Sequence, residues 1–288
     1  MQHPKFFPAS ELILNPDGSV YHLNLLPENI AENIITVGDP DRVGQVSQYF
    51  DSIDFRKQKR EFITHTGKFK GKPISVISTG MGTDNIEILM MELDALVNID
   101  LVKRTEKKDK RKLNIIRIGT SGSLQNEIPL DSHLVSGNGI GFDNLMNFYD
   151  LSMDDQQLEI TSLIQSKLGL SFRPYLAQAS SRLINQFAFD MLKGNTVTCP
   201  GFYSPQGRAL RLPLALPNLI ENMKLFDYQG FKLTNFEMET AGYYALGKLL
   251  GHEVISLNAI IANRITNQFS SNPSEVIDGL IRKVLDRI

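Results

Sequence analysis

The amino-acid sequence predicts an α/β protein with a central sheet that is mostly parallel or mixed. Short runs rich in β-branched residues alternate along the chain with stretches in which apolar residues have helical spacing. Such alternation is typical of a layered α/β architecture. The composition, with 42% hydrophobic and 22% charged residues, is that of a globular protein. The 288 residues contain no repeat, low-complexity tract or evident linker, so we expect one domain over residues 1–288.

Each expected element has its own local signal. Strands are expected where apolar and β-branched residues run together, at residues 33–38, 74–79, 113–119, 133–136, 232–236 and 254–262. Helices are expected where apolar residues recur at helical spacing, at residues 84–97, 156–168, 183–192, 241–250 and 274–288. Asp84 is a candidate N-cap, because a short carboxylate can accept a bond from a free backbone N–H at the start of a helix.

Charge and cysteine usage narrow the possible functions. The formal net charge is -2, so no global positive field favours nucleic acid or an anionic membrane. No apolar run is long enough to span a bilayer, and residues 1–10 lack the apolar core of a signal peptide. The single cysteine, Cys199, cannot form an internal disulfide, which fits a reducing compartment. We therefore expect a cytoplasmic protein with no nucleic-acid or membrane partner.

A basic run, KRTEKKDKRK, occupies residues 103–112. One interpretation is a patch for nucleic acid or another acidic partner. The other is a solvated, mobile extension between the helix at 84–97 and the strand at 113–119. The run has interspersed acids and no aromatic residue on which a base could stack, so we favour the second interpretation.

Two arginine-containing motifs follow expected strands, where α/β enzymes place ligands. In GDPDR, at residues 38–42, the glycine lets the backbone approach an anion and Arg42 can grip it. The alternative is a turn in which Pro40 starts a helix and Arg42 is exposed. In RIGTSG, at residues 117–122, Arg117 lies in an apolar run, where a buried cation is costly without an anionic partner. This second motif favours an anion site.

Two further motifs carry groups suited to a sugar and to a planar base. A carboxylate of FEMET, at residues 236–240, can accept hydrogen bonds from sugar hydroxyls, and its thioether can pack beneath the ring. The alternative is that its acids simply favour the first turn of a helix. In FYSPQGR, at residues 202–208, Phe202 can stack on a base while Gln206 donates and accepts at its edge. The alternative is an exposed proline-containing loop.

The sequence offers no cofactor or metal motif. The glycine clusters at residues 80–82 and 137–141 lack GxGxxG spacing, and GxxxxGK[ST] is absent. The five histidines, including His3, have no metal-ligand spacing. We therefore expect no dinucleotide, nucleoside triphosphate or metal site.

Taken in order, GDPDR, REF (residues 60–62), STGMG (residues 78–82), RIGTSG and FEMET resemble the signatures of the nucleoside phosphorylase superfamily. The resemblance runs from about residue 21 to residue 264. It implies a three-layer α/β/α fold with a central mixed β-sheet. Within the superfamily, FYSPQGR and the pair Asn263-Arg264 resemble the uridine phosphorylase family, since purine-cleaving relatives typically carry a Ser-Asp pair at the latter position.

The resemblance also implies a role for each motif residue. Phosphate would be bound by Gly38, Arg42, Arg117, Thr120 and, reaching into a neighbouring subunit's site, Arg60. Ribose would be bound by Glu237, Met238, Glu239 and, at a neighbouring site, His22. The base would be bound by Gly122, Phe202, Gln206, Arg208 and Arg264. The residues expected to contribute to catalysis are Arg208, Gln206 and Glu239.

The implied activity is the reversible phosphorolysis of uridine, or of deoxyuridine or thymidine, to free base and pentose 1-phosphate in pyrimidine salvage. Cationic Arg208 can stabilise the negative charge that develops on a departing uracil. A purine gains instead from protonation, and Arg264 cannot act as that acid. A purine nucleoside phosphorylase, a nucleosidase and a non-catalytic nucleoside-binding paralogue remain alternatives.

The resemblance further implies a homodimer or homohexamer with shared active sites. The resemblance implies no cofactor and no essential metal. Inorganic phosphate is a co-substrate. Some relatives bind a monovalent cation near the dimer contact, partly through the counterpart of Glu61.

Overall fold

The computed structural model describes residues 5–288. Residues 1–4, which include His3 and the start of the segment assessed as a signal peptide, lie outside the described part. The α-helices are α1 (Asp41–Ser47), α2 (Thr83–Asn98), α3 (Asp155–Leu168), α4 (Ser181–Phe187), α5 (Leu219–Leu225), α6 (Thr240–Leu250) and α7 (Pro273–Leu285). None of the helices in this part of the chain is long and apolar enough to cross a membrane.

The strands are β1 (Asn33–Val37), β2 (Ser52–Lys59), β3 (Phe62–Phe69), β4 (Lys72–Ser78), β5 (Ile99–Asp100), β6 (Thr105–Glu106), β7 (Asn114–Ser123), β8 (His133–Gly141), β9 (Tyr175–Gln178), β10 (Leu192–Thr198), β11 (Asp227–Tyr228), β12 (Phe231–Lys232), β13 (Asn235–Glu237), β14 (Glu253–Asn263) and β15 (Gln268–Phe269). Short 3₁₀ turns include η2 (Leu145–Asn147) and η3 (Ser204–Gln206).

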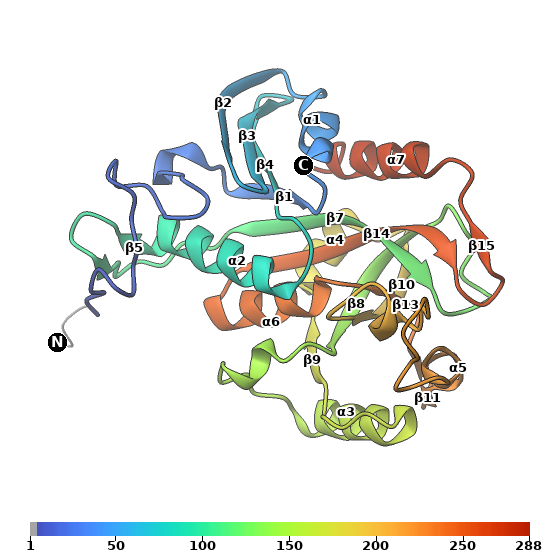
Figure 1. Cartoon of the computed structure of the whole chain (residues 1–288). Coiled ribbons are helices and arrows are strands. Elements are labelled where there is room, and N and C mark those ends of the chain that lie inside the picture. Colours follow the sequence, from blue (N-terminus) through green and yellow to red (C-terminus); the bar gives the residue numbers. More distant parts are fainter. Residues whose placement is uncertain (1–4) are drawn as a thin grey trace.

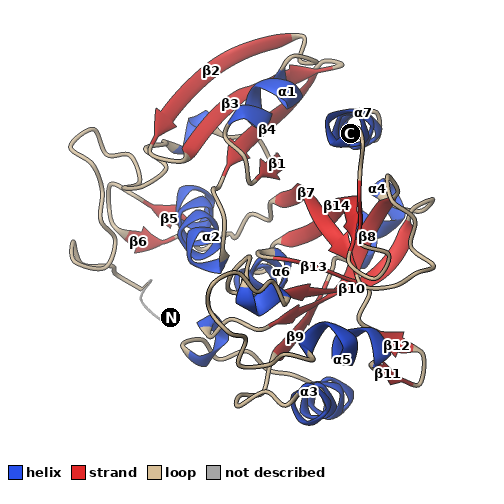
Figure 2. Cartoon of the chain, turned by 45° about the vertical axis from the view of Figure 1, so that its right-hand side comes forward, coloured by secondary structure: helices blue, strands red, loops and turns tan. Residues whose placement is uncertain are grey.

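The main sheet is mixed, as predicted, and part of it closes on itself. Its path runs β15-β14-β8-β10-β13-β7-β1-β4-β3-β2, with β9 paired to β8. Strand β14 also pairs in parallel with β7, while β7 pairs antiparallel with β13. Strands β14, β8, β10, β13 and β7 therefore form a ring of five, and β1 to β4 extend from it as an open sheet (Figure 2).

Helices cover both faces of the central strands. Ile34 and Ile115 belong to the hydrophobic core that also contains α2 and α6, whereas their neighbours Ile35 and Ile116 belong to the core of α1, α4 and α7. Successive side chains of a strand point to opposite faces, so the two cores lie on the two sides of the sheet. In Figure 1, α2 and α6 lie on one side of β7 and α1 and α7 on the other. The predicted three-layer α/β/α arrangement is confirmed.

Three sequence predictions of local structure are wrong, and one hairpin was missed. Helix α2 begins at Thr83 with Gly82 as its N-cap, so Asp84 lies in the first turn and is not the N-cap. The helix expected at residues 183–192 ends at Phe187, and residue 192 already begins β10, a buried strand of the ring. The strand expected at residues 232–236 is divided between β12 and β13. The hairpin of β2 and β3 was not expected, because β2 is largely polar and none of its residues is buried.

The basic run at residues 103–112 is largely exposed, as expected, but it is anchored at three points. Strand β6 pairs with β5. The guanidinium of Arg104 donates to the carbonyl of Leu12 at 2.6 and 2.9 Å, and Nζ of Lys107 donates to the carbonyl of Val97 at 3.1 Å. The run is therefore solvated, as expected, while its first half is paired and hydrogen-bonded to the rest of the chain.

Candidate active site

A cavity of about 660 Å³ lies at the carboxyl ends of β1, β4 and β7, beside the segments that follow β10 and β13. Parallel strands β1, β4 and β7 are neighbours, so the motifs that follow them meet at one edge of the sheet. The predicted site residues that line the cavity are Gly38, Arg42, Arg117, Thr120, Gly122, Phe202, Gln206, Arg208, Glu237, Met238 and Glu239. Motifs that lie up to 200 residues apart in sequence therefore form one pocket.

At the floor of this cavity, Arg117 is buried between two carboxylates. Its Nη2 lies 2.6 Å from Oε2 of Glu239 and 2.9 Å from Oε2 of Glu237. Burial alone would lower the pKa of Arg117, but the two carboxylates outweigh it and raise the pKa above its ordinary value. Gly119 makes this possible, because a Cβ there would lie 2.2 Å from Nη1 of Arg117. The sequence predicted that Arg117 needs an anionic partner, and the protein itself provides two, Glu237 and Glu239.

Glu237 holds the start of helix α6. Its carboxylate accepts the backbone N–H of Glu239 at 2.9 Å and of Thr240 at 2.9 Å, and the hydroxyl of Thr198 at 2.7 Å. Burial raises the pKa of Glu237, and the charge of Arg117 opposes that rise. Protein groups already contact both oxygens of Glu237 and of Glu239, which accepts the backbone N–H of Gly82 at 2.9 Å and pairs with Arg117, so both carboxylates organise the pocket floor. The ribose contacts expected of Glu237, Met238 and Glu239 stay predictions.

The end of the cavity that is predicted to bind phosphate combines Gly38, Arg42 and Thr120 with the floor. Helix α1 begins directly after Pro40, as the alternative interpretation of GDPDR expected, yet Arg42 faces the cavity and is partly buried. Burial lowers the pKa of Arg42, Asp39 opposes this, and the positive charge of Arg117 lowers the pKa further. Two guanidinium groups thus converge in one pocket, an arrangement that favours a bound anion.

The end of the cavity that is predicted to bind the base is built from the turn η3 and the residues after it. Nη1 of Arg208 donates to Oε1 of Gln206 at 2.5 Å and to the carbonyl of Phe202 at 2.7 Å. The guanidinium carbon of Arg208 lies 3.8 Å from the centre of the Phe202 ring. Nη1 of Arg264 donates to the backbone carbonyl of Gln206 at 2.9 Å, so Arg264 supports this loop from outside the cavity lining.

Besides Arg264, two predicted residues, His22 and Arg60, do not line the cavity within their own chain. Nδ1 of His22 lies 2.7 Å from Oε1 of Glu92, and that carboxylate also accepts the backbone N–H of His22. Arg60 lies exposed in the turn between β2 and β3, with a left-handed backbone (φ 55°), while the adjacent Glu61 lines the cavity. Both residues were expected to act at a neighbouring subunit's site, and that expectation stays a prediction.

The apolar wall of the cavity was missed from sequence. It consists of Met81, Phe236, Ile261, Ala262 and Phe269. Isolated apolar residues in strands carry no signal that separates a pocket wall from a core position. Phe269 is 65% exposed in the short strand β15, and that exposure is visible only in the structure.

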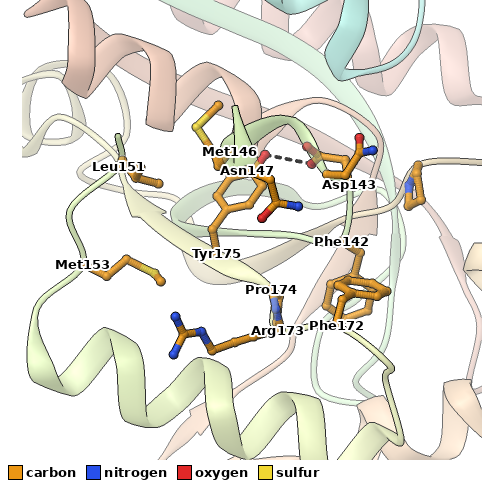
Figure 3. Close-up of a pocket in the computed structure, with 12 residues that line it drawn as sticks. Phe142, Asp143, Met146, Asn147, Leu151, Met153, Phe172, Arg173, Pro174 and Tyr175 are labelled. Carbon is orange, nitrogen blue, oxygen red and sulfur yellow. Dashed lines mark hydrogen bonds between the residues drawn. The ribbon is translucent and has the colours of Figure 1, made fainter. Parts of the chain in front are cut away.

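A second cavity, of about 550 Å³, shares no lining residue with the first and contains none of the predicted site residues (Figure 3). It lies among the segments around η2 and the start of β9, where the hydroxyl of Tyr175 donates to Oδ2 of Asp143 at 2.7 Å. Burial raises the pKa of Asp143. Within residues 5–288, no group of three or more His, Cys, Asp or Glu side chains is arranged to hold a metal ion.

The fold and the first cavity define an α/β protein whose pocket, at the carboxyl ends of neighbouring strands, brings three arginines together with buried carboxylates. A family model described as the phosphorylase superfamily matches residues 32–280. The chain belongs to the phosphorylase superfamily.

Individual relatives agree with this assignment. The chain is 29% identical over 263 residues to a uridine phosphorylase of Thermococcus kodakarensis, covering 91% of this chain and 84% of that protein. It is 27% identical over 254 residues to a DeoD-type purine nucleoside phosphorylase of Alkaliphilus metalliredigens, covering 85% and 88%. Among solved structures, a nucleoside phosphorylase of Trypanosoma brucei described as showing uridine phosphorylase activity superposes with a TM-score of 0.88 at 29% identity, covering 96% of this chain and 99% of that one.

Proposed function

We propose that this protein is a uridine phosphorylase that catalyses the reversible phosphorolysis of uridine to uracil and ribose 1-phosphate. One observation carries the proposal: a single cavity holds Arg42 and Arg117 at one end and the hydrogen-bonded pair Gln206 and Arg208 at the other. Glu239, which pairs with Arg117, lines the same cavity and would accept hydrogen bonds from ribose hydroxyls. The likeness to proteins named as uridine phosphorylases supports the same activity.

In the proposed reaction, the glycosidic bond loosens toward an oxocarbenium-like sugar and phosphate attacks C1′. The guanidinium of Arg42 holds phosphate, while the neighbouring Arg117 is neutralised by Glu237 and Glu239 and orients the pocket floor. The departing uracil carries negative charge on its carbonyl oxygens, which Arg208 and the amide of Gln206 stabilise as it develops. The stacked Phe202 and Arg208 limit the movement of this end of the pocket.

The cations at the base end favour a pyrimidine. A purine leaving group gains from protonation by an acid, and Arg264, which supports the Gln206 loop, does not release its proton. The proposal includes deoxyuridine and thymidine as further substrates. The apolar residues Ile261 and Phe269 border the cavity that would take them.

We further propose that the active enzyme is a homodimer or homohexamer in which Arg60 and His22 complete a neighbouring site. The position of Arg60 in an exposed turn beside the cavity-lining Glu61 supports this arrangement. A cytoplasmic location and a role in pyrimidine salvage follow from the proposed activity, with no cofactor beyond the phosphate co-substrate. A monovalent cation near Glu61 at the subunit contact remains part of the prediction.

The test is an ultraviolet assay of uridine, deoxyuridine, thymidine, inosine and adenosine, each with and without phosphate. We expect uridine to be consumed only when phosphate is present. Cleavage of inosine in preference to uridine would instead identify a purine nucleoside phosphorylase, and cleavage without phosphate a nucleosidase. Binding without turnover of any nucleoside would leave a non-catalytic binding protein.

A further inference from the structure

The interior of the five-stranded ring contains a continuous belt of buried polar side chains. Each strand contributes one member, and the members are bonded in the order in which the strands pair. The belt consists of Asn258 on β14, Ser136 on β8, Thr196 on β10, Asn235 on β13 and Ser121 on β7. The first four are fully buried and Ser121 is 6% exposed.

The two ends of the belt lie in the substrate cavity. At one end, Nη1 of Arg117 donates to Oδ1 of Asn258 at 3.1 Å. At the other end, Nδ2 of Asn235 donates to Oγ of Ser121 at 2.9 Å. Arg117 and Ser121 both line the cavity, and they lie on the same face of β7 because they are four residues apart.

The belt has a fixed direction because a guanidinium can only donate hydrogen bonds. Arg117 thereby turns Oδ1 of Asn258 toward itself, and the amide nitrogen of Asn258 donates onward to the hydroxyl of Ser136 at 3.0 Å. Since Thr196 donates its only hydroxyl proton to Oδ1 of Asn235 at 2.9 Å, Ser136 must donate to Thr196, at 2.5 Å. Every donor points away from the cation.

This direction determines what Ser121 presents to a ligand. Its oxygen accepts from Asn235, and within residues 5–288 its own proton has no acceptor. The hydroxyl of Ser121 therefore remains a donor at the base end of the cavity, next to Gly122, whose neighbours are Phe236 and Arg264.

We propose that the belt is a positioning network, in which Asn258, Ser136, Thr196 and Asn235 hold Arg117 and the hydroxyl of Ser121 as one unit at the two ends of the substrate pocket. The inference rests on the proposed function for the identity of the ligands. It adds four positioning residues that contact no substrate. It also predicts that disturbance at the phosphate end of the pocket reaches the base end through the interior of the ring.

The central variant is Thr196→Val, which keeps the side-chain shape and removes only the hydroxyl in the middle of the belt. The matched control is Thr161→Val in α3, where an equally buried hydroxyl bonds the carbonyl of Gln157 at 2.8 Å, outside the belt. Binding of uracil and of inorganic phosphate is measured separately by calorimetry, with the melting temperature of each variant. We expect Thr196→Val to weaken uracil binding about fivefold or more, Thr196→Ser to restore it, and Thr161→Val to leave it unchanged.

A double-mutant cycle tests the coupling along the belt. Asn258→Ala and Ser121→Ala are combined, and uracil affinity is measured for each variant. Distant residues that act independently combine within about a factor of two, so we expect a larger departure from additivity here and its disappearance when Thr196→Val is added.

Several outcomes would overturn the inference. If Thr196→Val and Thr161→Val lower the melting temperature alike and leave both affinities unchanged, the belt is only structural. Additive effects of Asn258→Ala and Ser121→Ala would rule out the coupling. A wild-type protein that binds neither phosphate nor uracil would overturn the proposed function and this inference together, whereas one that binds both and yet shows no belt effect overturns the inference alone.

Discussion

The guanidinium of Arg208 donates a hydrogen bond of 2.5 Å to the side-chain oxygen of Gln206. This bond fixes the orientation of the amide, because the oxygen of Gln206 is turned toward Arg208 and its nitrogen keeps both donors. Arg208 is in turn held by the ring of Phe202, 3.8 Å away. The pair therefore presents a set of preorganised donors to an acceptor atom on a base.

Arg208→Ala should reduce uridine phosphorolysis by about 10²–10³-fold, because it removes a donor aimed at the charge that develops on the leaving base. Stability should change little, since Arg208 is only partly buried. The measurements are kcat/KM for uridine and the midpoint of urea unfolding. Arg211→Ala, at an exposed arginine of the same loop, is the matched control. Equal losses of activity and stability in Arg208→Ala would contradict a role in the site.

Arg42→Ala and Arg117→Met should separate phosphate binding from folding. Arg42 forms no ion pair within residues 5–288, so its removal should raise the KM for phosphate at least about tenfold with little change in stability. Arg117→Met leaves Glu237 and Glu239 buried without their cation, which should cost about 3–5 kcal/mol in the free energy of unfolding. Chemical denaturation and phosphate saturation curves test both statements. A stable Arg117→Met protein would show that the buried ion pairs are dispensable for folding.

Arg60→Ala and Arg208→Ala should complement each other if sites are shared between subunits. Each variant alone should be nearly inactive. After unfolding and refolding together, a mixed dimer contains one site with both arginines intact, so about a quarter of the wild-type activity should return at equal mixing. The control mixes Arg208→Ala with Gln206→Ala. Both residues line the cavity of their own subunit, so every site in a mixed dimer carries one of the two changes and activity should not return. An absence of recovery in the first mixture, with mixed oligomers demonstrated by mass spectrometry, would exclude the shared site.

The stability of the protein should depend on pH through His133. Burial holds the pKa of His133 below its usual value of 6.5, although its bond to the carbonyl of Val276 opposes the shift. In the unfolded chain His133 becomes protonated near pH 6.5, whereas in the folded protein it becomes protonated only at a lower pH. The contribution of neutral His133 to the free energy of unfolding is therefore complete above pH 6.5 and is lost as the pH falls toward the lowered pKa.

The matching variant is His133→Gln, whose amide can still donate to Val276 but does not titrate. Urea midpoints measured at about pH 7.5 and about pH 5.5 should differ less for His133→Gln than for the wild type. Parallel curves for the two proteins would mean that His133 does not contribute to the pH dependence.

Most of the fold could be predicted from sequence because the central strands are long apolar runs. Periodicity located β1, β4, β7 and β14, together with the helices α2, α3, α6 and α7. It failed at β10, whose residues LKGNTVT mix polar and small side chains. Those polar residues are buried because Thr196 belongs to the belt and Thr198 bonds Glu237, and such tertiary contacts leave no local pattern.

The candidate site was predictable where a short motif contains a residue that its surroundings would not favour, such as the charged Arg117 in its apolar strand. Arg42, Gln206 and Arg208 line one cavity, as the motifs predicted. Phe269 and the polar belt could not be predicted. Strand register and the closing of the ring place their members together, and neither can be read from spacing along the chain.

The pairing of β14 with both β7 and β8 has a consequence for how the molecule is made. Until residues 253–263 have left the ribosome, the gap between those two strands stays open and the ring cannot close. Asn258 belongs to β14, so a nascent chain that lacks this strand cannot yet hold Arg117 in place through that bond. Binding competence should therefore be acquired late during synthesis, after helices α1 to α6 have been made.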